Sequence, residues 1–379
     1  MRIGVNTIPL YPGQIGGMEK YTVNLLTHLT AIDRQHRYYL FVARYNRALF
    51  DSQFQRANVF RVQTLSLQGL RYSKRAAARL AAFMGRRLPC LSRWLVNAVA
   101  SAQMMYSIRR HRIDLWFCPL INLVPRHVRL PSVVSLPDLQ PEFYPDFFPR
   151  DLLEWLRRRD PASCRDATKV IALSEFSRAT IIERYGLRPG KVHTIGLAVS
   201  DESRLPPEDS AVDAVKATSA LPAEYAFYPA NTWPHKNDPT LLKALHRLKT
   251  KYRTRLSCVF QDMPLLYRGA RFLVFPSLFE GFGLPLLEAM ASDCPVLCSS
   301  AGSLPEVVGD AALLFDPNDP EEMADSMHRI LTDEERRRTR VKTGRERALQ
   351  FSWERTARET LKVLEEAASI GTHPSHTHR

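Results

Sequence analysis

Residues 274–324 read VFPSLFEGFGLPLLEAMASDCPVLCSSAGSLPEVVGDAALLFDPNDPEEMA and contain the most informative pattern of the chain. A short apolar run ends at Phe275, a loop with two glycines follows, and a stretch with helical period extends over Leu284–Ser292. Two further apolar runs occupy Pro295–Ser299 and Ala311–Phe315. This alternation predicts parallel strands that are connected by helices.

The same alternation extends outward through the rest of the chain. The first half has predicted strands at Arg2–Thr7, Tyr38–Arg44, Asn58–Gln63, Asp114–Cys118, Ser132–Leu136, Lys169–Ser174 and Lys191–Ile195. Its predicted helices are Glu19–Leu29, Leu91–Arg110, Leu152–Arg159 and Phe176–Tyr185. The second half adds strands at Tyr225–Tyr228, Arg255–Phe260 and Arg271–Phe275, with helices at Pro239–Lys249, Asp262–Gly269 and Pro320–Leu331. An α/β architecture is therefore expected throughout.

The length of 379 residues exceeds what one hydrophobic core usually spans, which favours two domains. Residues 201–224 are polar and marked by prolines, so they are the expected linker. We expect an N-terminal domain over 1–200, a smaller C-terminal domain over 225–352, a last helix over 353–368 and a disordered tail over 369–379.

Charge is unevenly distributed. The chain has 53 Lys and Arg against 39 Asp and Glu, a formal net charge of +14, and no acidic residue occurs between Asp51 and Asp114. The basic stretch 56–112 reads either as a solvated face or as a surface that docks on an anionic membrane. Nucleic acid is not an expected partner, because no zinc finger, aromatic RNP strand or helix-turn-helix pattern is present.

The six cysteines form no C-x-x-C pair and no zinc-type spacing with histidine. Such cysteine usage fits a reducing compartment, and the sequence from Met1 onward has no apolar leader. We therefore expect a cytoplasmic protein, with peripheral attachment to the inner face of the plasma membrane as the finer expectation.

Two loops could hold an anionic ligand. Gly16 and Gly17 stand between the first predicted strand and the first predicted helix, where free backbone N–H groups favour an anion. Lys236 follows a predicted strand of the second half, at the sheet edge where α/β domains bind ligands. A surface lysine and an ordinary glycine turn are the alternatives for these residues.

The motif SLFEGFGLPLLEAM (277–290) adds two carboxylates. Glu280 lies in the glycine loop and Glu288 in the following helix, whose first turn is suited to Pro285. Gly281 and Gly283 would leave backbone amides open to phosphate. Because carboxylates repel phosphate, we expect Glu280 and Glu288 to contact sugar or ribose hydroxyls instead. A turn residue and a solvent-facing glutamate are the alternatives.

Residues 274–324 resemble the C-terminal signature of family 4 glycosyltransferases, a retaining group with the GT-B fold. ANTWPHKN (230–237), VIALSEFSRATIIERYGL (170–187) and GGMEKY (16–21) are similar to other stretches of that family. The resemblance covers both halves of the chain. It implies two Rossmann-like domains that face a cleft, the second of them shortened here, and a last helix that returns to the N-terminal domain.

The resemblance also implies roles for matching residues. Glu280 and Glu288 match a Glu-x7-Glu motif, in which the first glutamate lies by the donor sugar and the second binds the ribose. Lys236 matches the lysine that neutralises the donor diphosphate. The backbone of Gly283, Leu284 and Pro285 matches the cradle of that group, and Gly16 with Gly17 matches the loop that faces diphosphate and acceptor. Enzymes of this kind use neither metal nor cofactor.

Three departures from the family pattern are visible. SLPDLQPEFYPDFFP (135–149) has Pro137 and Pro141 where relatives commonly have the two histidines of His-Asp-x-x-His, and only Asp138 remains. Asn231 stands near the place of an arginine that often precedes the diphosphate lysine. Between Lys236 and Glu280 the chain is short, since Gln261 follows the predicted strand at once.

The preferred hypothesis is a retaining transferase that moves a sugar, with mannose favoured, from a nucleotide diphosphate sugar to a glycan or lipid-linked glycan acceptor. The expected setting is bacterial surface polysaccharide synthesis, such as lipopolysaccharide. Glu280 and Asp138 are the candidate catalytic residues. The alternative is a catalytically inactive GT-B protein that acts as a scaffold, and a GT-B epimerase or phosphorylase is a third class.

Overall fold

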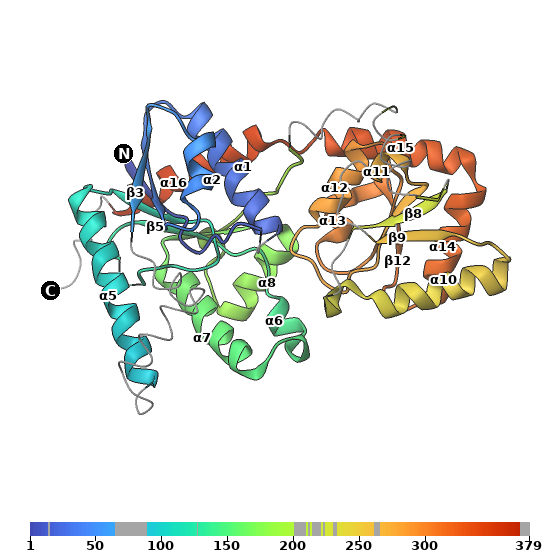
Figure 1. Cartoon of the computed structure of the whole chain (residues 1–379), viewed down its shortest axis with the longest axis horizontal. Coiled ribbons are helices and arrows are strands. Elements are labelled where there is room, and N and C mark those ends of the chain that lie inside the picture. Colours follow the sequence, from blue (N-terminus) through green and yellow to red (C-terminus); the bar gives the residue numbers. More distant parts are fainter. Residues whose placement is uncertain are drawn as a thin grey trace.

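The computed structural model describes residues 1–13, 16–64, 89–126, 128–200, 210, 213, 221–222, 224–229, 233–260 and 266–371. Five of the sequence features above fall outside these ranges: Asn231, residues 261–265, most of the predicted linker, residues 65–88 of the basic stretch, and residues 372–379 of the predicted tail. Two parallel sheets form the centres of two bodies, which lie side by side along the long axis of the molecule (Figure 1). We call them the N-terminal body and the C-terminal body.

The N-terminal body contains a seven-stranded sheet in the order β3-β2-β1-β4-β5-β6-β7, with every pair of neighbours parallel. Its strands are β1 (Arg2–Asn6), β2 (Arg37–Val42), β3 (Val59–Gln63), β4 (Leu115–Cys118), β5 (Ser132–Ser135), β6 (Lys169–Ala172) and β7 (Val192–Thr194). β4 and β5 are buried at every position, as expected for central strands that are covered on both faces.

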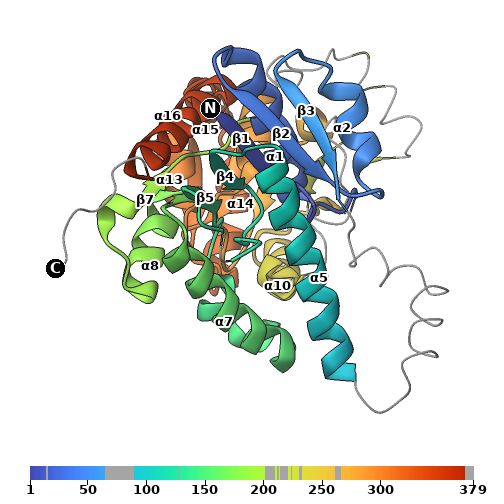
Figure 2. The same ribbon diagram turned by 90° about the vertical axis from the view of Figure 1, so that its left-hand side faces the viewer.

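Helices cover both faces of this sheet, as Figure 2 shows. They are α1 (Gly17–Ile32), α2 (Arg47–Gln53), α5 (Pro89–Arg110), α6 (Gln140–Phe143), α7 (Arg150–Asp166) and α8 (Glu175–Tyr185). The bounds of α8 follow from its sequence, because the Ser174 hydroxyl accepts the N–H of Ser177 and Gly186 ends the helix in a left-handed conformation.

The C-terminal body has a five-stranded parallel sheet in the order β12-β11-β10-β8-β9. Its strands are β8 (Tyr225–Tyr228), β9 (Ser257–Phe260), β10 (Phe272–Phe275), β11 (Val296–Ser299) and β12 (Ala312–Phe315). The helices are α10 (Asp238–Tyr252), α11 (Leu266–Gly269), α12 (Leu284–Ala291), α13 (Leu304–Val308), α14 (Pro320–Thr332) and α15 (Glu334–Ala348). These two sheets confirm the predicted α/β class.

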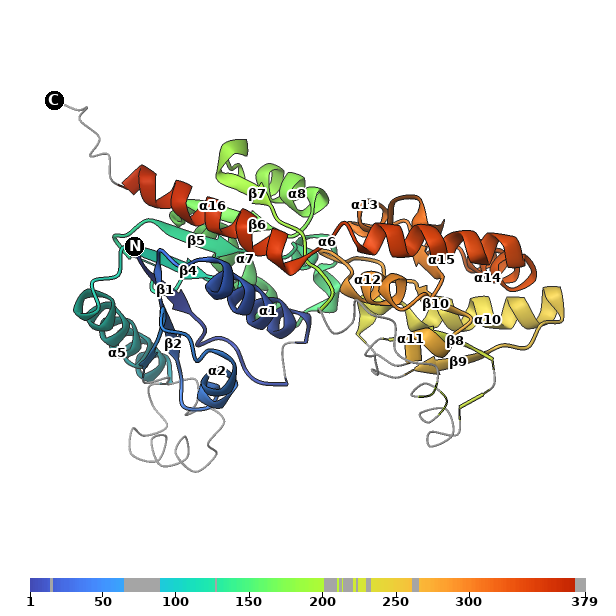
Figure 3. The ribbon, with the colours of Figure 1, turned by 90° about the horizontal axis from the view of Figure 1, so that it is seen from above.

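The last helix, α16 (Trp353–Gly371), connects the two bodies. It runs back along the N-terminal body beside α1, as Figure 3 shows, and packs against β4 and β5. The Thr356 hydroxyl donates a hydrogen bond to the Gly196 carbonyl, and Leu364 is fully buried. The helix ends at Gly371, so the sequence prediction of a disordered tail from residue 369 onward is wrong for residues 369–371. The helix continues past the exposed Ser369, whose hydroxyl donates a hydrogen bond to the Glu366 carbonyl.

Strand order places the candidate loops together. In the C-terminal sheet β10 and β9 flank β8, so the chain reverses direction across the sheet between β8 and β10. Loops at the carboxyl ends of strands beside such a reversal form the usual ligand crevice of α/β sheets. Lys236 follows β8 and Glu280 follows β10. Among the described residues, no helix has both the length and the apolar character needed to cross a membrane.

Candidate functional site

The lysine loop and the glutamate loop of the C-terminal body are in direct contact. Lys236 ends the short 3-10 helix η4 (Pro234–Lys236), and its ammonium lies 2.6 Å from Glu280 Oε1. Both side chains are only 16% exposed. The same ammonium lies 5.0 Å from the centroid of the Phe275 ring, a favourable cation–π position. The sheet edge therefore holds a paired, partly buried cation and carboxylate.

Asn237 fixes the lysine loop to its neighbours. Its backbone is left-handed, with φ 66°, and its buried amide donates hydrogen bonds to the carbonyls of Pro276 and Pro317 at 3.1 and 2.7 Å. The backbone N–H of Leu278 donates to the His235 carbonyl at 2.8 Å. The loop after β8 is thus tied to the loop after β10, which sets the separation of Lys236 and Glu280.

The glycine loop leads directly into α12. Gly283 precedes the helix with φ 94°, a backbone conformation that side chains strongly disfavour. No side-chain hydrogen bond caps this helix start among the described residues, and Pro285 lies in its first turn. The positive end of α12 therefore remains available at Gly283 and Leu284, as the sequence motif predicts.

Glu288 lies one turn into α12 and contacts both bodies. Its Oε1 accepts a 2.9 Å hydrogen bond from the Lys20 ammonium of α1, and its Oε2 accepts one of 2.9 Å from the Tyr267 hydroxyl of α11. Gly16 and Gly17 are exposed at the start of α1, and the Lys20 N–H donates to the Gly16 carbonyl. The structure thus places the N-terminal glycine loop opposite α12.

The bodies meet tightly beside Glu280. Gly281 faces the Pro137 carbonyl and the Asp138 side chain so closely that an added Cβ would lie 2.6 Å from that carbonyl oxygen. The Ser177 hydroxyl of α8 donates to Pro137 O at 2.9 Å. Only glycine fits here without displacing backbone. Asp138 is therefore held against the glutamate loop.

An aromatic cluster fills the same seam. Phe279 is 3% exposed and packs against Phe143, Tyr144 and Phe176 of the N-terminal body, with ring centroids 4.9 to 6.0 Å apart. The Tyr144 hydroxyl donates a 3.2 Å hydrogen bond to the Leu278 carbonyl. Phe279, which directly precedes Glu280, is thus anchored in the opposite body. The position of Glu280 therefore depends on the contact between the two bodies.

A further contact caps α8 from the opposite body. The Glu306 carboxylate of α13 accepts the backbone N–H groups of Glu175 and Phe176, each at 3.0 Å. A carboxylate at a helix N-terminus satisfies unpaired donors and the positive end of the helix dipole. Together with the aromatic cluster, this contact stabilises the observed closed arrangement.

The environment of Asp138 changes its acidity. Burial raises the pKa of Asp138 from 3.8 to about 6; the charges of Glu280 and Asp160 act in the same direction, whereas the Gln140 N–H and Lys236 oppose them. This aspartate therefore exchanges a proton close to neutral pH.

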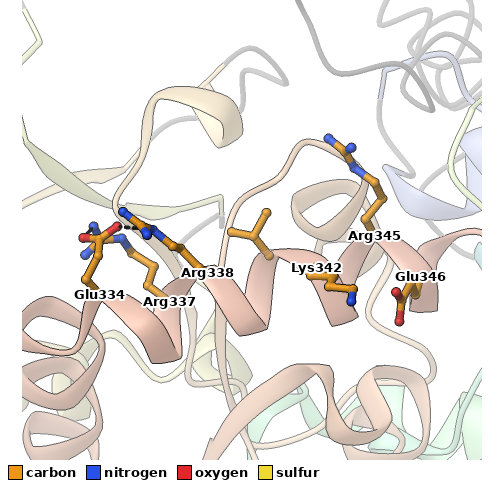
Figure 4. A pocket seen from close by; sticks show the side chains of 7 residues that line it. Glu334, Arg337, Arg338, Lys342, Arg345 and Glu346 are labelled. Atoms are coloured by element: carbon orange, nitrogen blue, oxygen red, sulfur yellow. Dashed lines mark hydrogen bonds and ion pairs between the residues drawn. The ribbon is translucent and has the colours of Figure 1, made fainter.

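A separate hollow runs along α15 and is drawn in Figure 4. Its lining includes Arg337, Arg338, Lys342 and Arg345, and Glu334 forms an ion pair with Arg337. None of the candidate site residues lines this hollow. Within the described ranges, no three His, Cys, Asp or Glu side chains gather in a group that could hold a metal ion.

The sequence reasoning missed several residues of the site. Asn237 could have been found, since it follows Lys236 directly, and Phe279 precedes Glu280. Lys20 and Tyr267 were not singled out, because both contact Glu288, which is 268 positions from Lys20. Tyr144 lies in the segment that departs from the family pattern.

Comparison with known proteins assigns the class. Residues 15–203 match the model of glycosyltransferase family 4, and residues 258–347 match that of the glycosyl transferases group 1. A solved structure, Anabaena HepE in complex with UDP and glucose, is similar with a TM-score of 0.68 and 17% identity, and the match covers 97% of this chain and 100% of that one. This likeness shows the fold, which is the GT-B arrangement. The chain belongs to the family 4 glycosyltransferases.

Two curated relatives are similar over longer stretches. O-antigen chain mannosyltransferase B of Escherichia coli is 29% identical over 319 residues, which are 75% of this chain and 82% of the relative. The MMP alpha-(1->4)-mannosyltransferase of Mycolicibacterium hassiacum is 28% identical over 236 residues, 54% of this chain and 55% of the relative. The chain thus spans most of the first relative and about half of the second.

The raised pKa of Asp138 gives a testable dependence of stability on pH. Between about pH 4 and 6 the folded state binds more protons at Asp138 than the unfolded state, so the contribution of this residue to stability falls as the pH rises through that window. We expect Asp138→Asn to unfold at nearly the wild-type temperature near pH 4 and at a higher temperature than wild type above pH 6. Thermal unfolding of both proteins across this range measures the difference. A difference that is constant with pH would contradict the assignment.

Proposed function

We propose that the protein transfers mannose, with retention at the anomeric carbon, from a nucleotide diphosphate sugar to a glycan or lipid-linked glycan of a bacterial surface polysaccharide such as lipopolysaccharide. The observation that carries the proposal is the joint placement of Lys236, Glu280 and the start of α12 at one sheet edge. The relatives named as mannosyltransferases favour this sugar, and the name of the Escherichia coli relative favours this setting.

In this proposal the diphosphate binds between Lys236 and the amides of Gly283 and Leu284, next to Pro285. Glu280 Oε1 lies 2.6 Å from the Lys236 ammonium. When a diphosphate arrives, the ammonium can turn to the phosphate oxygens while Glu280 becomes free to meet sugar hydroxyls. Fixed positive groups that stabilise the departing diphosphate need no metal and little reorganisation.

The remaining residues complete the cleft. Glu288 would accept the ribose hydroxyls, and the backbone of Gly16 and Gly17 would face the diphosphate and the acceptor. Asp138 lies against the glutamate loop, between Pro137 and Pro141, and is the candidate catalytic residue on the acceptor side. The closed seam would exclude water, which otherwise competes as acceptor.

The catalytically inactive alternative gains no support from the relatives, which are named as transferases. Product analysis distinguishes the transferase from a GT-B epimerase or phosphorylase, the third class of function considered for this sequence. An epimerase or phosphorylase would release an altered nucleotide sugar or a sugar phosphate and form no new glycosidic bond.

Lys236→Met tests the proposed donor site. Losing one fixed cation at the departing diphosphate should lower turnover by about 10²- to 10³-fold. Release of the nucleoside diphosphate from UDP, GDP, ADP and dTDP sugars measures it. Lys243→Met, at an exposed position of α10, is the matched control and should retain wild-type turnover. Equal turnover of both variants would contradict the assigned role of Lys236.

We further propose that the protein works on the cytoplasmic side, attached to an anionic membrane surface through the basic stretch 56–112. In the described part of this stretch, α5 ends in Arg109 and Arg110, and Tyr106 is 61% exposed. Helix α7 also supports such attachment. Its Trp155 is 48% exposed, and Arg157, Arg158 and Arg159 follow shortly after it in the sequence. Basic residues near a charged surface contribute about 1 kcal/mol each.

Vesicles test this attachment. The protein should bind vesicles that contain phosphatidylglycerol and not vesicles of phosphatidylcholine alone, and added salt should release it. Reversing the charges of Arg75, Arg79, Arg86 and Arg87 should weaken binding. Equal binding to neutral vesicles would refute the electrostatic attachment.

A further inference from the structure

Both carboxylate oxygens of Glu288 are held by side chains from opposite bodies. Tyr267 of the C-terminal body donates to Oε2 and Lys20 of the N-terminal body donates to Oε1, each at 2.9 Å. The Glu288 side chain is 15% exposed, whereas that of Lys20 is 51% exposed. Tyr267 therefore orients the Glu288 carboxylate from the same body, and Lys20 contacts it from the opposite body.

The Tyr267 contact is rigid. Tyr267 is 3% exposed, and its ring packs edge-on against Phe227 of β8 with a centroid distance of 4.9 Å. A buried ring in this geometry has little rotational freedom. The short helix α11 thus fixes the direction of the Glu288 carboxylate. It does so within the stretch between Lys236 and Glu280 that is shorter than the family pattern.

The Lys20 contact depends on how the bodies are placed. Lys20 belongs to the first turn of α1, three residues after Gly17, and it reaches Glu288 only while α1 faces α12. An ionised carboxylate offers about four acceptor positions, so two ribose hydroxyls can still bind beside the Lys20 and Tyr267 donors. Lys20 therefore need not leave when a ribose binds.

Charge gives Lys20 an effect on the donor. An unpaired Glu288 would repel the diphosphate of the donor, and the ammonium at 2.9 Å neutralises that carboxylate. We infer that Lys20 is a positioning residue of the donor site, contributed by the opposite body, which acts through Glu288 and makes ribose binding favour the closed arrangement. This inference rests on the proposed function, because it takes the donor to be a nucleoside diphosphate sugar that Glu288 contacts.

Calorimetric titration with GDP and with UDP tests the inference on the full chain. An exposed ion pair contributes up to about 1 kcal/mol, so Lys20→Met should weaken binding of the nucleotide by about fivefold, and less at high salt. Lys20→Arg should restore most of the affinity, because it retains the cation. Lys243→Met, with the same loss of charge on exposed α10, should bind as wild type does.

A double-mutant cycle shows whether Lys20 acts through Glu288. In the Glu288→Gln background, the further change Lys20→Met should alter affinity by less than about twofold, since the charge that it neutralises is gone. Wild-type affinity of Lys20→Met, or an undiminished fivefold effect in the Glu288→Gln background, would overturn the inference alone. Failure of the wild-type protein to bind either nucleotide would instead overturn the proposed donor site, and the inference with it.

Discussion

The close approach of Gly281 to Pro137 and Asp138 is the constraint on which the rest of the site depends. A Cβ at residue 281 has no room, so glycine lets the loop after β10 come into contact with the loop after β5. The inserted Phe279 and the Tyr144 hydrogen bond then fix the same loop on its other side. Glu280 lies between these two contacts, so its position is set by the fit of two bodies and not by its own sheet alone.

The segment 137–144, which departs from the family pattern at Pro137 and Pro141, contributes directly to this contact between the bodies. Pro137 gives its carbonyl to Ser177, and Phe143 and Tyr144 supply the aromatic surface that receives Phe279. Asp138 lies at the same contact, and burial raises its pKa to about 6. The segment is thus part of the seam between the bodies.

Much of the fold could be predicted because each body is built from local patterns. The runs at 225–228 and 272–275 became β8 and β10, and the glycine loop with Pro285 correctly marked the start of α12. Short elements without strong periodicity, such as α2, α6 and α13, had no comparable signal. Helix α16 was predicted slightly too short, because its last residues before Gly371 are exposed and show no apolar period that marks where the helix ends.

Each predicted site residue was found from a short motif that lies within a single body. The structure adds contact partners that are far away in the sequence and belong to the other body. Lys20 and Glu288 meet across 268 positions, and Glu306 reaches Glu175 across 131. Such contacts depend on domain placement, which no local pattern encodes. Through the first of these contacts a cation and a carboxylate of opposite bodies are already paired beside the site.

A crystal structure of the protein with a bound nucleotide sugar would test the central claim most directly. The account predicts the diphosphate between Lys236 and the start of α12, the ribose on Glu288, and Gly281 still against Pro137. A nucleotide bound away from Lys236 and Glu288 would contradict it.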